Sequence, residues 1–341
     1  MRRAIALVFV LLALPGAANG QDAVTDFYRG RTVNLIVGYS AGGGYDTYTR
    51  ILARHLGKHI PGNPTIVVQN MPGAGSLKLA NYLYNVAPKD GATIGIFSRG
   101  MAMEPLIGAS NTQFDSSRFA WLGSGTSEVS VFVVWHTAPI KTFQDMLEKP
   151  FTVGGEGSGS DPDIFSAMIR SAFGAKLKLV SGYPGSAEVA LAIERGEVDG
   201  RCGWSWSSLK LLRPDWIAQK KVNLLAQLAL QGTPELPDVP LIMSVATSDR
   251  QRQMLKLVLS RQSMARPFAA PPDIPADRKQ ALRKAFDATM ADAEFLAEAK
   301  QRGLEVNPVG GVAIDALVGE LYATPPEIIA EVRATISEGA R

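Results

Sequence analysis

Short apolar segments alternate with glycine-rich turns and amphipathic segments along this chain. The runs at residues 33–37, 65–69 and 93–97 are short and rich in Val and Ile, which predicts strands, the first of them buried. The segments at 46–60 and 76–86 carry apolar residues at helical spacing, so we expect helices there. The order strand, helix, strand, helix, strand predicts a parallel sheet that is covered by helices on both faces.

The same pattern starts again in the middle of the chain. A helix is expected to begin at Asp161, because an N-cap aspartate is followed by a proline at the first helical position. From about residue 241 the chain is mostly helical and ends in a helix near 326–337. The expected elements of the middle part are strands at 129–135, 151–154, 177–180 and 198–202 and helices at 161–173 and 187–195.

The length of 341 residues exceeds one ordinary core and suggests two domains. We predict an α/β fold whose first domain is discontinuous, formed by residues 25–125 and 235–341, with a second domain at 126–234. The C-terminal part has too few strands for a domain of its own and is expected to fold back onto the first unit. The chain then crosses twice between the domains, which predicts a hinge with a ligand cleft.

The N-terminus has the layout of a secretory signal peptide. Two arginines precede an apolar run at residues 4–14, and small residues at 17–20 offer a cleavage site. A membrane-spanning helix needs about 20 apolar residues, so this run is too short for an anchor. We predict that residues 1–20 are removed as a signal peptide and that the mature protein works in the periplasm.

Charge and cysteine content exclude several classes of protein. Lys and Arg total 35 against 32 Asp and Glu, a net charge of +3 that falls to about +1 without the two arginines of the signal peptide. This balance argues against a nucleic-acid partner, which requires a basic face. Cys202 is the only cysteine, so neither an internal disulfide nor a zinc site of several cysteines is expected. We predict no cofactor and no metal, and we expect a monomer.

Four glycine-containing loops follow predicted strands and precede predicted helices. In open α/β sheets, ligands lie beyond the carboxyl ends of the strands, where backbone N–H groups at helix N-termini favour anions. Glycine lets this backbone approach a ligand closely. Two of the loops fall in each predicted domain, which would let them meet across the cleft. The alternative is that the glycines only form tight turns and that Asp46 and Asp161 only cap helices. The loops are residues 39–46, 70–76, 156–161 and 183–186.

These loops resemble, in the same order, the motifs of the Bug receptors, the periplasmic solute-binding proteins of tripartite tricarboxylate transporters. The matching segments are Gly-Tyr-Ser-Ala-Gly-Gly-Gly-Tyr-Asp at 38–46, Asn-Met-Pro-Gly-Ala-Gly at 70–75, the Gly-Ser loop at 155–160, and Tyr-Pro-Gly-Ser at 183–186 with Gly-Glu-Val-Asp at 196–199. The resemblance covers most of residues 27–200. It implies a periplasmic binding protein type II-like fold of two α/β domains that captures a small di- or tricarboxylate or aromatic acid and delivers it to membrane transporter subunits.

The resemblance also implies that the first loop holds one carboxylate together with ordered waters, and that the loop at 158–160 contributes from the second domain. The chain departs from the family at three places. The first loop has no proline, Asp161 and its neighbours stand where many members have a histidine, and the aspartate of amino-acid-binding members is absent, which argues against an amino-acid ligand. The predicted ligand-binding residues are Tyr39, Ser40, Ala41, Gly42, Gly43, Asp46, Gly75, Arg99, Ser158, Gly159, Ser160, Asp161, Tyr183, Trp204 and Trp206.

Four of the large side chains near these loops have two interpretations each. Trp204 and Trp206 belong either to the core or to an apolar wall for an aromatic or hydrocarbon ligand body. Arg99 follows a predicted strand at its carboxyl end, where it is either a solvated surface residue or a bidentate partner of a carboxylate. Arg201 has the same two interpretations.

A serine esterase is the alternative function. The segment 38–42, Gly-Tyr-Ser-Ala-Gly, fits a nucleophile elbow between a strand and a helix, with Ser40 as the nucleophile. However, no His-Gly-Gly oxyanion motif is present, and His55 and His59 lie on the helix directly after the loop, which leaves only His136 as a base. A nucleotide site is disfavoured because the glycine loop lacks the Lys-Ser/Thr of a P-loop.

Overall fold

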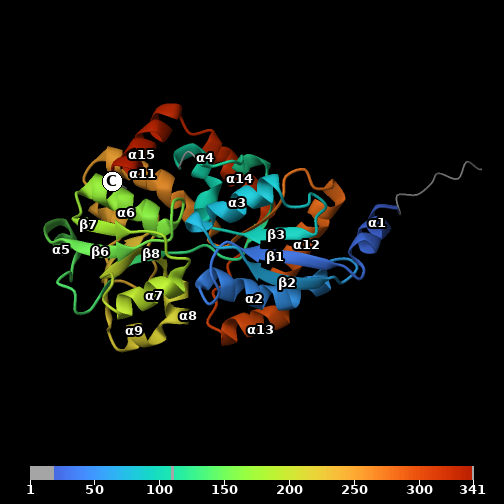
Figure 1. Cartoon of the computed structure of the whole chain (residues 1–341), viewed down its shortest axis with the longest axis horizontal. Helices are drawn as coiled ribbons and strands as arrows, with labels where there is room; N and C mark the ends of the chain where they lie inside the picture. The colour runs from blue at the N-terminus through green and yellow to red at the C-terminus, as the bar shows by residue number, and fades with distance from the viewer. Residues whose placement is uncertain (1–18, 109–110, 340–341) are drawn as a thin grey trace, which may run out of the picture.

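The computed structural model describes residues 19–108 and 111–339, which form two sheets arranged along the long axis of the molecule (Figure 1). Residues 1–18 of the predicted signal peptide lie outside the described residues, and Asn19 begins the first described helix. Among the described residues, no helix combines the length and the apolar character needed to span a bilayer.

The first sheet contains the three strands predicted from the first half of the chain. β1 (Thr32–Val37) lies between β2 (Thr65–Asn70) and β3 (Thr93–Ile96), and it runs parallel to both. The predicted β-α-β-α-β unit is therefore confirmed. The single helix expected over residues 46–60 ends earlier, because its last turn tightens into a 3-10 helix at Gly57–His59.

Three antiparallel strands complete the first sheet, in the order β11-β4-β10-β3-β1-β2. β4 (Ala120–Ser124) pairs with both β10 (Pro267–Ala270) and β11 (Val309–Gly310). β10 and β11 come from the C-terminal region, which was expected to be mostly helical and in which no strand was located. They are too short to produce a readable alternation of apolar and polar residues.

The second sheet has the order β7-β6-β8-β5-β9. Its members are β5 (Ser130–Trp135), β6 (Phe151–Gly154), β7 (Leu177–Val180), β8 (Gly200–Ser205) and β9 (Val222–Leu228). β6 runs parallel to β7 and β8, whereas β5 is antiparallel to β8 and β9. The sheet is therefore mixed, and β9 was not anticipated.

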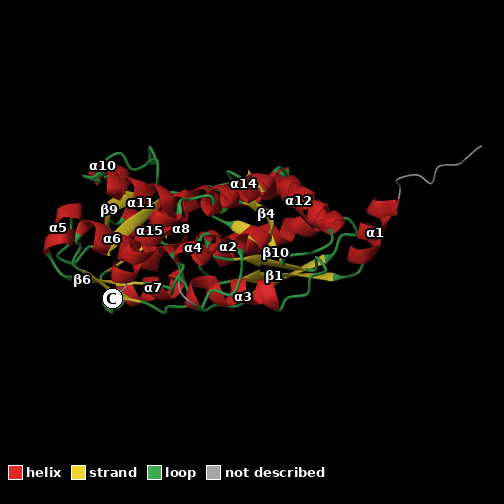
Figure 2. Cartoon of the chain, turned by 90° about the horizontal axis from the view of Figure 1, so that it is seen from above, coloured by secondary structure: helices red, strands yellow, loops and turns green. Residues whose placement is uncertain are grey.

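The helices cover both sheets, and the C-terminal region contributes to each side. α12 and α14 pack on β4, whereas α15 packs on α6 beside the second sheet (Figures 1 and 2). Because the C-terminal helices pack beside both sheets, the domain boundaries expected at residues 125/126 and 234/235 stay a prediction. The helices are α1 (Asn19–Tyr28), α2 (Gly44–Leu56), α3 (Leu77–Asn85), α4 (Glu104–Ile107), α5 (Phe143–Glu148), α6 (Asp161–Phe173), α7 (Ser186–Glu194), α8 (Trp206–Leu212), α9 (Pro214–Ala218), α10 (Ile242–Val245), α11 (Asp249–Leu259), α12 (Ala276–Met290), α13 (Ala293–Gln301), α14 (Gly311–Tyr322) and α15 (Pro326–Gly339).

Candidate functional site

The four glycine loops meet between the two sheets, at the carboxyl ends of their parallel strands. Ser40 N donates to the carbonyl of Pro184 at 3.2 Å, which joins the first loop to the fourth. Gly75 N donates to the carbonyl of Glu156 at 2.7 Å, which joins the second loop to the third. These backbone bonds bring residues more than 80 positions apart into one site, as the loops' placement after strands had suggested.

Glycine is required where the loops touch. Gly75 has φ +62°, and a Cβ there would lie 2.7 Å from the carbonyl oxygens of both Gly157 and Ser158. A Cβ on Gly43 would lie 2.9 Å from Ser186 Oγ. A larger residue at Gly75 would therefore push the two halves of the site apart, whereas at Gly43 the hydroxyl of Ser186 would only have to rotate.

Two small cavities lie between the loops, with volumes of about 30 and about 20 Å³. Their shared lining combines aromatic, cationic and anionic side chains with a hydroxyl group. The residues that line both cavities are Tyr39, Tyr45, Glu156, Arg201 and Ser205.

The first loop is shaped by Asp46, at the beginning of α2. Its carboxylate accepts hydrogen bonds from Gly42 N at 2.9 Å, from Asn70 Nδ2 at 2.8 Å and from Arg50 Nε. Burial raises the pKa of Asp46, but the bonds from Arg50, Gly42 and Asn70 outweigh it, and the pKa is lowered overall. Asp46 therefore holds the loop in shape and does not line either cavity.

The other residues of the first loop divide between the cavities and the surface. Tyr39 is buried beside Tyr45, with ring centroids 4.8 Å apart, and Gly43 lines the larger cavity. Ala41 and Gly42 are exposed and line neither cavity.

Ser40 Oγ donates to Glu188 Oε2 on α7 at 2.8 Å, so the side chain of the candidate esterase nucleophile contacts a carboxylate. The histidines lie elsewhere among the described residues. His55 and His59 contact carboxylates next to α13, and the ring of His136 lies beside Trp135.

Arg99 is buried at the end of β3, with 2% of its surface exposed, so its interpretation as a solvated surface residue is wrong. Its Nε donates to Asp161 Oδ2 at 2.6 Å, and its Nη2 donates to Ser130 Oγ at 2.8 Å. Burial lowers the pKa of Arg99, but the charge of Asp161 reverses this and raises it overall, so the guanidinium keeps its charge. Arg99 Nη1 and Asp161 Oδ1 have no hydrogen-bond partner.

Arg201 is also buried, which again excludes a surface role. It forms an ion pair with Glu156 and lies over the ring of Trp204, 5.1 Å from the centroid. Burial raises the pKa of Glu156, although the charge of Arg201 opposes the shift. Arg201 Nε and Trp204 Nε1 have no hydrogen-bond partner, and both residues line the larger cavity.

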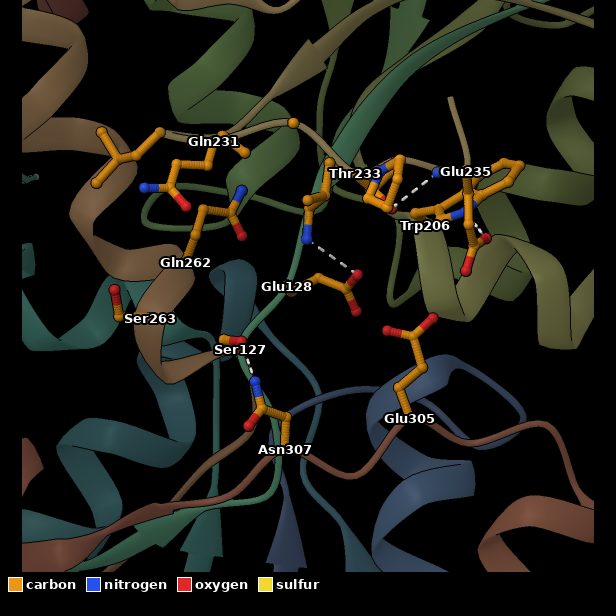
Figure 3. Close-up of a pocket in the computed structure, with 15 residues that line it drawn as sticks. Ser127, Glu128, Trp206, Gln231, Thr233, Glu235, Gln262, Ser263, Glu305 and Asn307 are labelled. Carbon is orange, nitrogen blue, oxygen red and sulfur yellow. Dashed lines mark hydrogen bonds between the residues drawn. The ribbon is translucent and has the colours of Figure 1, made fainter. Parts of the chain in front are cut away.

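Trp204 satisfies both interpretations, because it also packs against Trp216 in the core, with ring centroids 5.7 Å apart. Trp206 belongs to the same apolar cluster but does not line the cavity that Trp204 lines. Since Trp206 begins α8, it lines a separate hollow, where its Nε1 donates to Glu235 Oε2 at 2.7 Å (Figure 3). The predicted common wall of two tryptophans is therefore wrong.

The second-domain loop contributes mainly through its backbone. The carbonyl of Gly159 accepts from Ser98 Oγ at 3.0 Å, and Ser160 Oγ donates to Asp163. Ser158 and Gly159 line another hollow, next to α4 and α15, and not the two cavities between the loops. Tyr183 is half-buried and also lies outside the cavity lining.

Arg266 is a residue that the sequence did not reveal. It precedes β10, lines the larger cavity, and donates from Nη2 to Ser208 Oγ at 2.7 Å. Its guanidinium lies 4.7 Å from the centroid of Tyr45 and 3.7 Å from a Glu128 oxygen. No motif surrounds it, and its segment was expected to be helical, so no signal in the sequence points to it.

One group of side chains in the described part of the chain could share a metal ion: His55, Asp292 and Glu294, whose ligand atoms lie within 4.8 Å of one another. The ammonium of Lys58 already lies 2.7 Å from Asp292 and 2.5 Å from Glu294. We interpret this group as an ion-pair network that fastens α13 to α2.

Three comparisons connect this geometry to known proteins. A protein from Agrobacterium vitis, described as the UPF0065 protein in the TAR-I ttuE-ttuC' intergenic region, is 25% identical over 297 residues, which is 85% of this chain and 79% of that protein. The structure of the periplasmic binding protein BugD has a TM-score of 0.73 at 22% identity, covering 89% of this chain and 98% of BugD. MatC from Rhodopseudomonas palustris, solved with bound malate, has a TM-score of 0.70 at 18% identity, covering 88% of this chain and 99% of MatC.

The two structural matches show the fold, that of a two-domain periplasmic binding protein, as predicted. The family model described as "Tripartite tricarboxylate transporter family receptor" matches residues 49–328. This match includes three of the four glycine loops, the whole second sheet and every strand of the first sheet except β1. The chain therefore belongs to the receptor family of the tripartite tricarboxylate transporters.

Proposed function

We propose that this chain binds a small organic carboxylate between its two sheets, in the periplasm, and delivers it to the membrane subunits of a tripartite transporter. The observation that carries the proposal is a set of buried donors without partners in this place: Arg99 Nη1, Arg201 Nε and Trp204 Nε1. Three donors at the edge of two adjoining cavities call for a ligand that supplies acceptor oxygens.

Energetics support an anionic acceptor. A buried donor without a partner costs roughly 1–3 kcal/mol, and a hydrogen bond to a charged group contributes roughly 1.5–3 kcal/mol. Micromolar affinity requires about 8 kcal/mol, which a few such bonds and the burial of an apolar ligand body can supply together. The rings of Tyr39, Tyr45 and Trp204 offer that apolar surface.

The ligand would enter by separation of the two halves. The cavities of about 30 and about 20 Å³ each match the volume of about one water molecule, whereas ligand sites usually measure about 300–1,000 Å³. The contacts that must open include Ser40–Glu188 and Ser98–Gly159. We propose that this motion is a hinge movement of two domains, residues 25–125 with 235–341 against 126–234.

Two further considerations favour binding over catalysis. MatC, which shares the fold, holds malate. In addition, Ser40 contacts a glutamate and no histidine, so no base is positioned to activate it as a nucleophile. We propose that the protein is a receptor and not an esterase.

The test is thermal unfolding of the mature chain with malate, succinate and benzoate, each compared with its uncharged amide. A ligand at 100 times its Kd stabilises the folded protein by about 2.7 kcal/mol. We expect at least one acid to raise the unfolding temperature and its amide to leave it unchanged. Arg201→Met should remove the effect, while Arg302→Met, at the exposed C-cap residue of α13, should not. If no acid stabilises the protein at millimolar concentration, the proposal is wrong.

A further inference from the structure

The hollow that Trp206 lines is larger than the cavities between the glycine loops, with a volume of about 680 Å³, and it lies at the proposed hinge (Figure 3). This volume is within the range of small-molecule sites, about 300–1,000 Å³. Its walls come from the segments 127–129 and 229–235, through which the chain passes between the sheets, and from residues next to β10 and β11. It shares no lining residue with the two cavities between the glycine loops, so it is a separate site.

Two carboxylates converge in this hollow. The side chain of Glu128 is 2% exposed and is held by Val129 N at 3.1 Å and by the hydroxyl of Ser207. In Figure 3 the carboxylates of Glu128 and Glu305 point toward each other. Burial raises the pKa of Glu128, Arg266 opposes this shift, and the charge of Glu305 adds to it, so the two acidic groups interact. Arg266 lies 3.7 Å from a Glu128 oxygen and Lys210 Nζ lies 2.8 Å from Glu305 Oε1, so each carboxylate has one cationic partner. A further positive charge between the two carboxylates would be attracted by both.

Gln262 provides an independent indication of a ligand. Only 5% of its surface is exposed, and its Nε2 donates to the carbonyl of Leu228 at 2.9 Å, which fixes the orientation of the amide. Its Oε1 has no hydrogen-bond partner, and Figure 3 shows the amide facing the space next to Glu128. A buried acceptor without a partner is unfavourable, so a ligand for this hollow would carry a donor.

The rim of the hollow already stabilises one cation. Lys210 Nζ lies 5.6 Å from the centroid of Trp206 and donates to both oxygens of Glu235. It also donates to Glu305 Oε1 at 2.8 Å. The described hydrogen bonds thus occupy both oxygens of Glu235 but only one of Glu305, whose second oxygen remains available to a ligand.

We propose that the hinge hollow binds a small organic cation, a primary ammonium or guanidinium compound, with its charged group between Glu128 and Glu305 and one N–H on Gln262 Oε1. The aromatic ring of Trp206 and the aliphatic side chains of the 229–235 segment contact the body of the ligand. The walls of the hollow belong to both segments that connect the two sheets. The bound cation therefore contacts both segments and restricts the hinge movement.

Calorimetric titration of the mature protein with tyramine tests this proposal, with N-acetyltyramine as the probe of matched body and no charge. We expect tyramine to bind with a stoichiometry of one and N-acetyltyramine not to bind. Glu305→Gln should weaken tyramine binding by at least about threefold, since one partly exposed charge pair is lost. Glu320→Gln, at an exposed glutamate on α14, should leave the affinity unchanged.

Three results would overturn the proposal: no binding of tyramine at millimolar concentration, equal binding of both probes, or equal affinity of wild type and Glu305→Gln. None of them involves a carboxylate ligand, so the test is independent of the function proposed for the cleft.

Discussion

Gly75→Ala should open the cleft of this receptor without unfolding either half. A Cβ at this position would lie 2.7 Å from the carbonyl oxygens of Gly157 and Ser158 and 2.9 Å from Ser160 Cβ. Two of these atoms are backbone, so they cannot rotate away. The opposing loop must retreat by at least about 0.5 Å to reach ordinary contact distance, and the bond from Gly75 N to the carbonyl of Glu156 is strained with it.

The free-energy cost of Gly75→Ala has two parts, and only one of them depends on whether the cleft is closed. A non-glycine residue with the φ of +62° found here costs roughly 1–2 kcal/mol, whether the cleft is open or closed. Overpacking adds roughly 1–3 kcal/mol, and only in the closed arrangement. Since a ligand binds to the closed form, its affinity should fall between about 5-fold and about 150-fold.

Gly303→Ala is the matched control. Gly303 has φ +69°, and a Cβ there would meet no atom within 4 Å, so this variant carries the backbone strain without the clash. Calorimetry with malate, or with any acid that stabilises the protein, measures the affinity, and small-angle scattering of the ligand-free variants measures the opening. We expect a larger radius of gyration and weaker binding for Gly75→Ala alone. Equal affinities of the two variants would refute the role assigned to this contact.

Three further predictions address the site, the charge network and the proposed receptor function. Trp204→Phe keeps the aromatic wall but removes a donor, so acid affinity measured by calorimetry should fall by about 3–10-fold; an unchanged affinity would leave Trp204 with a packing role only. Hydrogen bonds from Arg54 and His55 lower the pKa of Glu298 from 4.5 to about 2, so the stabilisation is present above pH 4.5 and is lost as the pH falls toward 2. Calorimetric unfolding from pH 5 to pH 2 should show this loss, and Glu298→Gln should reduce it; an unaltered slope would contradict the assignment. Ser40→Ala should leave any ester-hydrolysis background unchanged, and turnover that depends on Ser40 would contradict a receptor function.

The sequence predicted the parts of the fold that depend on local pattern. Strands β1, β2 and β3 are short and rich in Val and Ile, and β1 and β2 are each followed by a turn and a helix, so their order alone implies a parallel sheet. β10 and β11 escaped prediction because four and two residues are too few to show a period. Their placement in the first sheet depends on pairing with β4, a long-range contact that no local pattern encodes.

The site, too, could be predicted only where it depends on local sequence pattern. The glycine loops carry a motif, and the structure does bring them together, but the motif does not say which way a side chain points. Trp204 and Trp206 are two residues apart, yet β8 ends between them and sends Trp206 to the hinge hollow. Arg266 reaches the cleft because β10 inserts between β3 and β4, so its role follows from topology and not from its neighbours in the sequence.

In the proposed function, the arginines between the sheets let a ligand control the closure of the two halves. The Arg99–Asp161 pair joins a residue next to β3 to the beginning of α6, and the bond from Arg266 to Ser208 joins the segment before β10 to α8, so both contacts connect the first sheet to the second. Burying an ion pair roughly balances its Coulombic gain against the loss of hydration, so these contacts alone favour closure only weakly. A carboxylate that accepts from Arg99 Nη1 adds a charge-assisted bond without removing Asp161 from Nε. The bound ligand then supplies the free energy of closure that the protein's own ion pairs do not supply. The closed arrangement is therefore the one that is populated when an acid is bound.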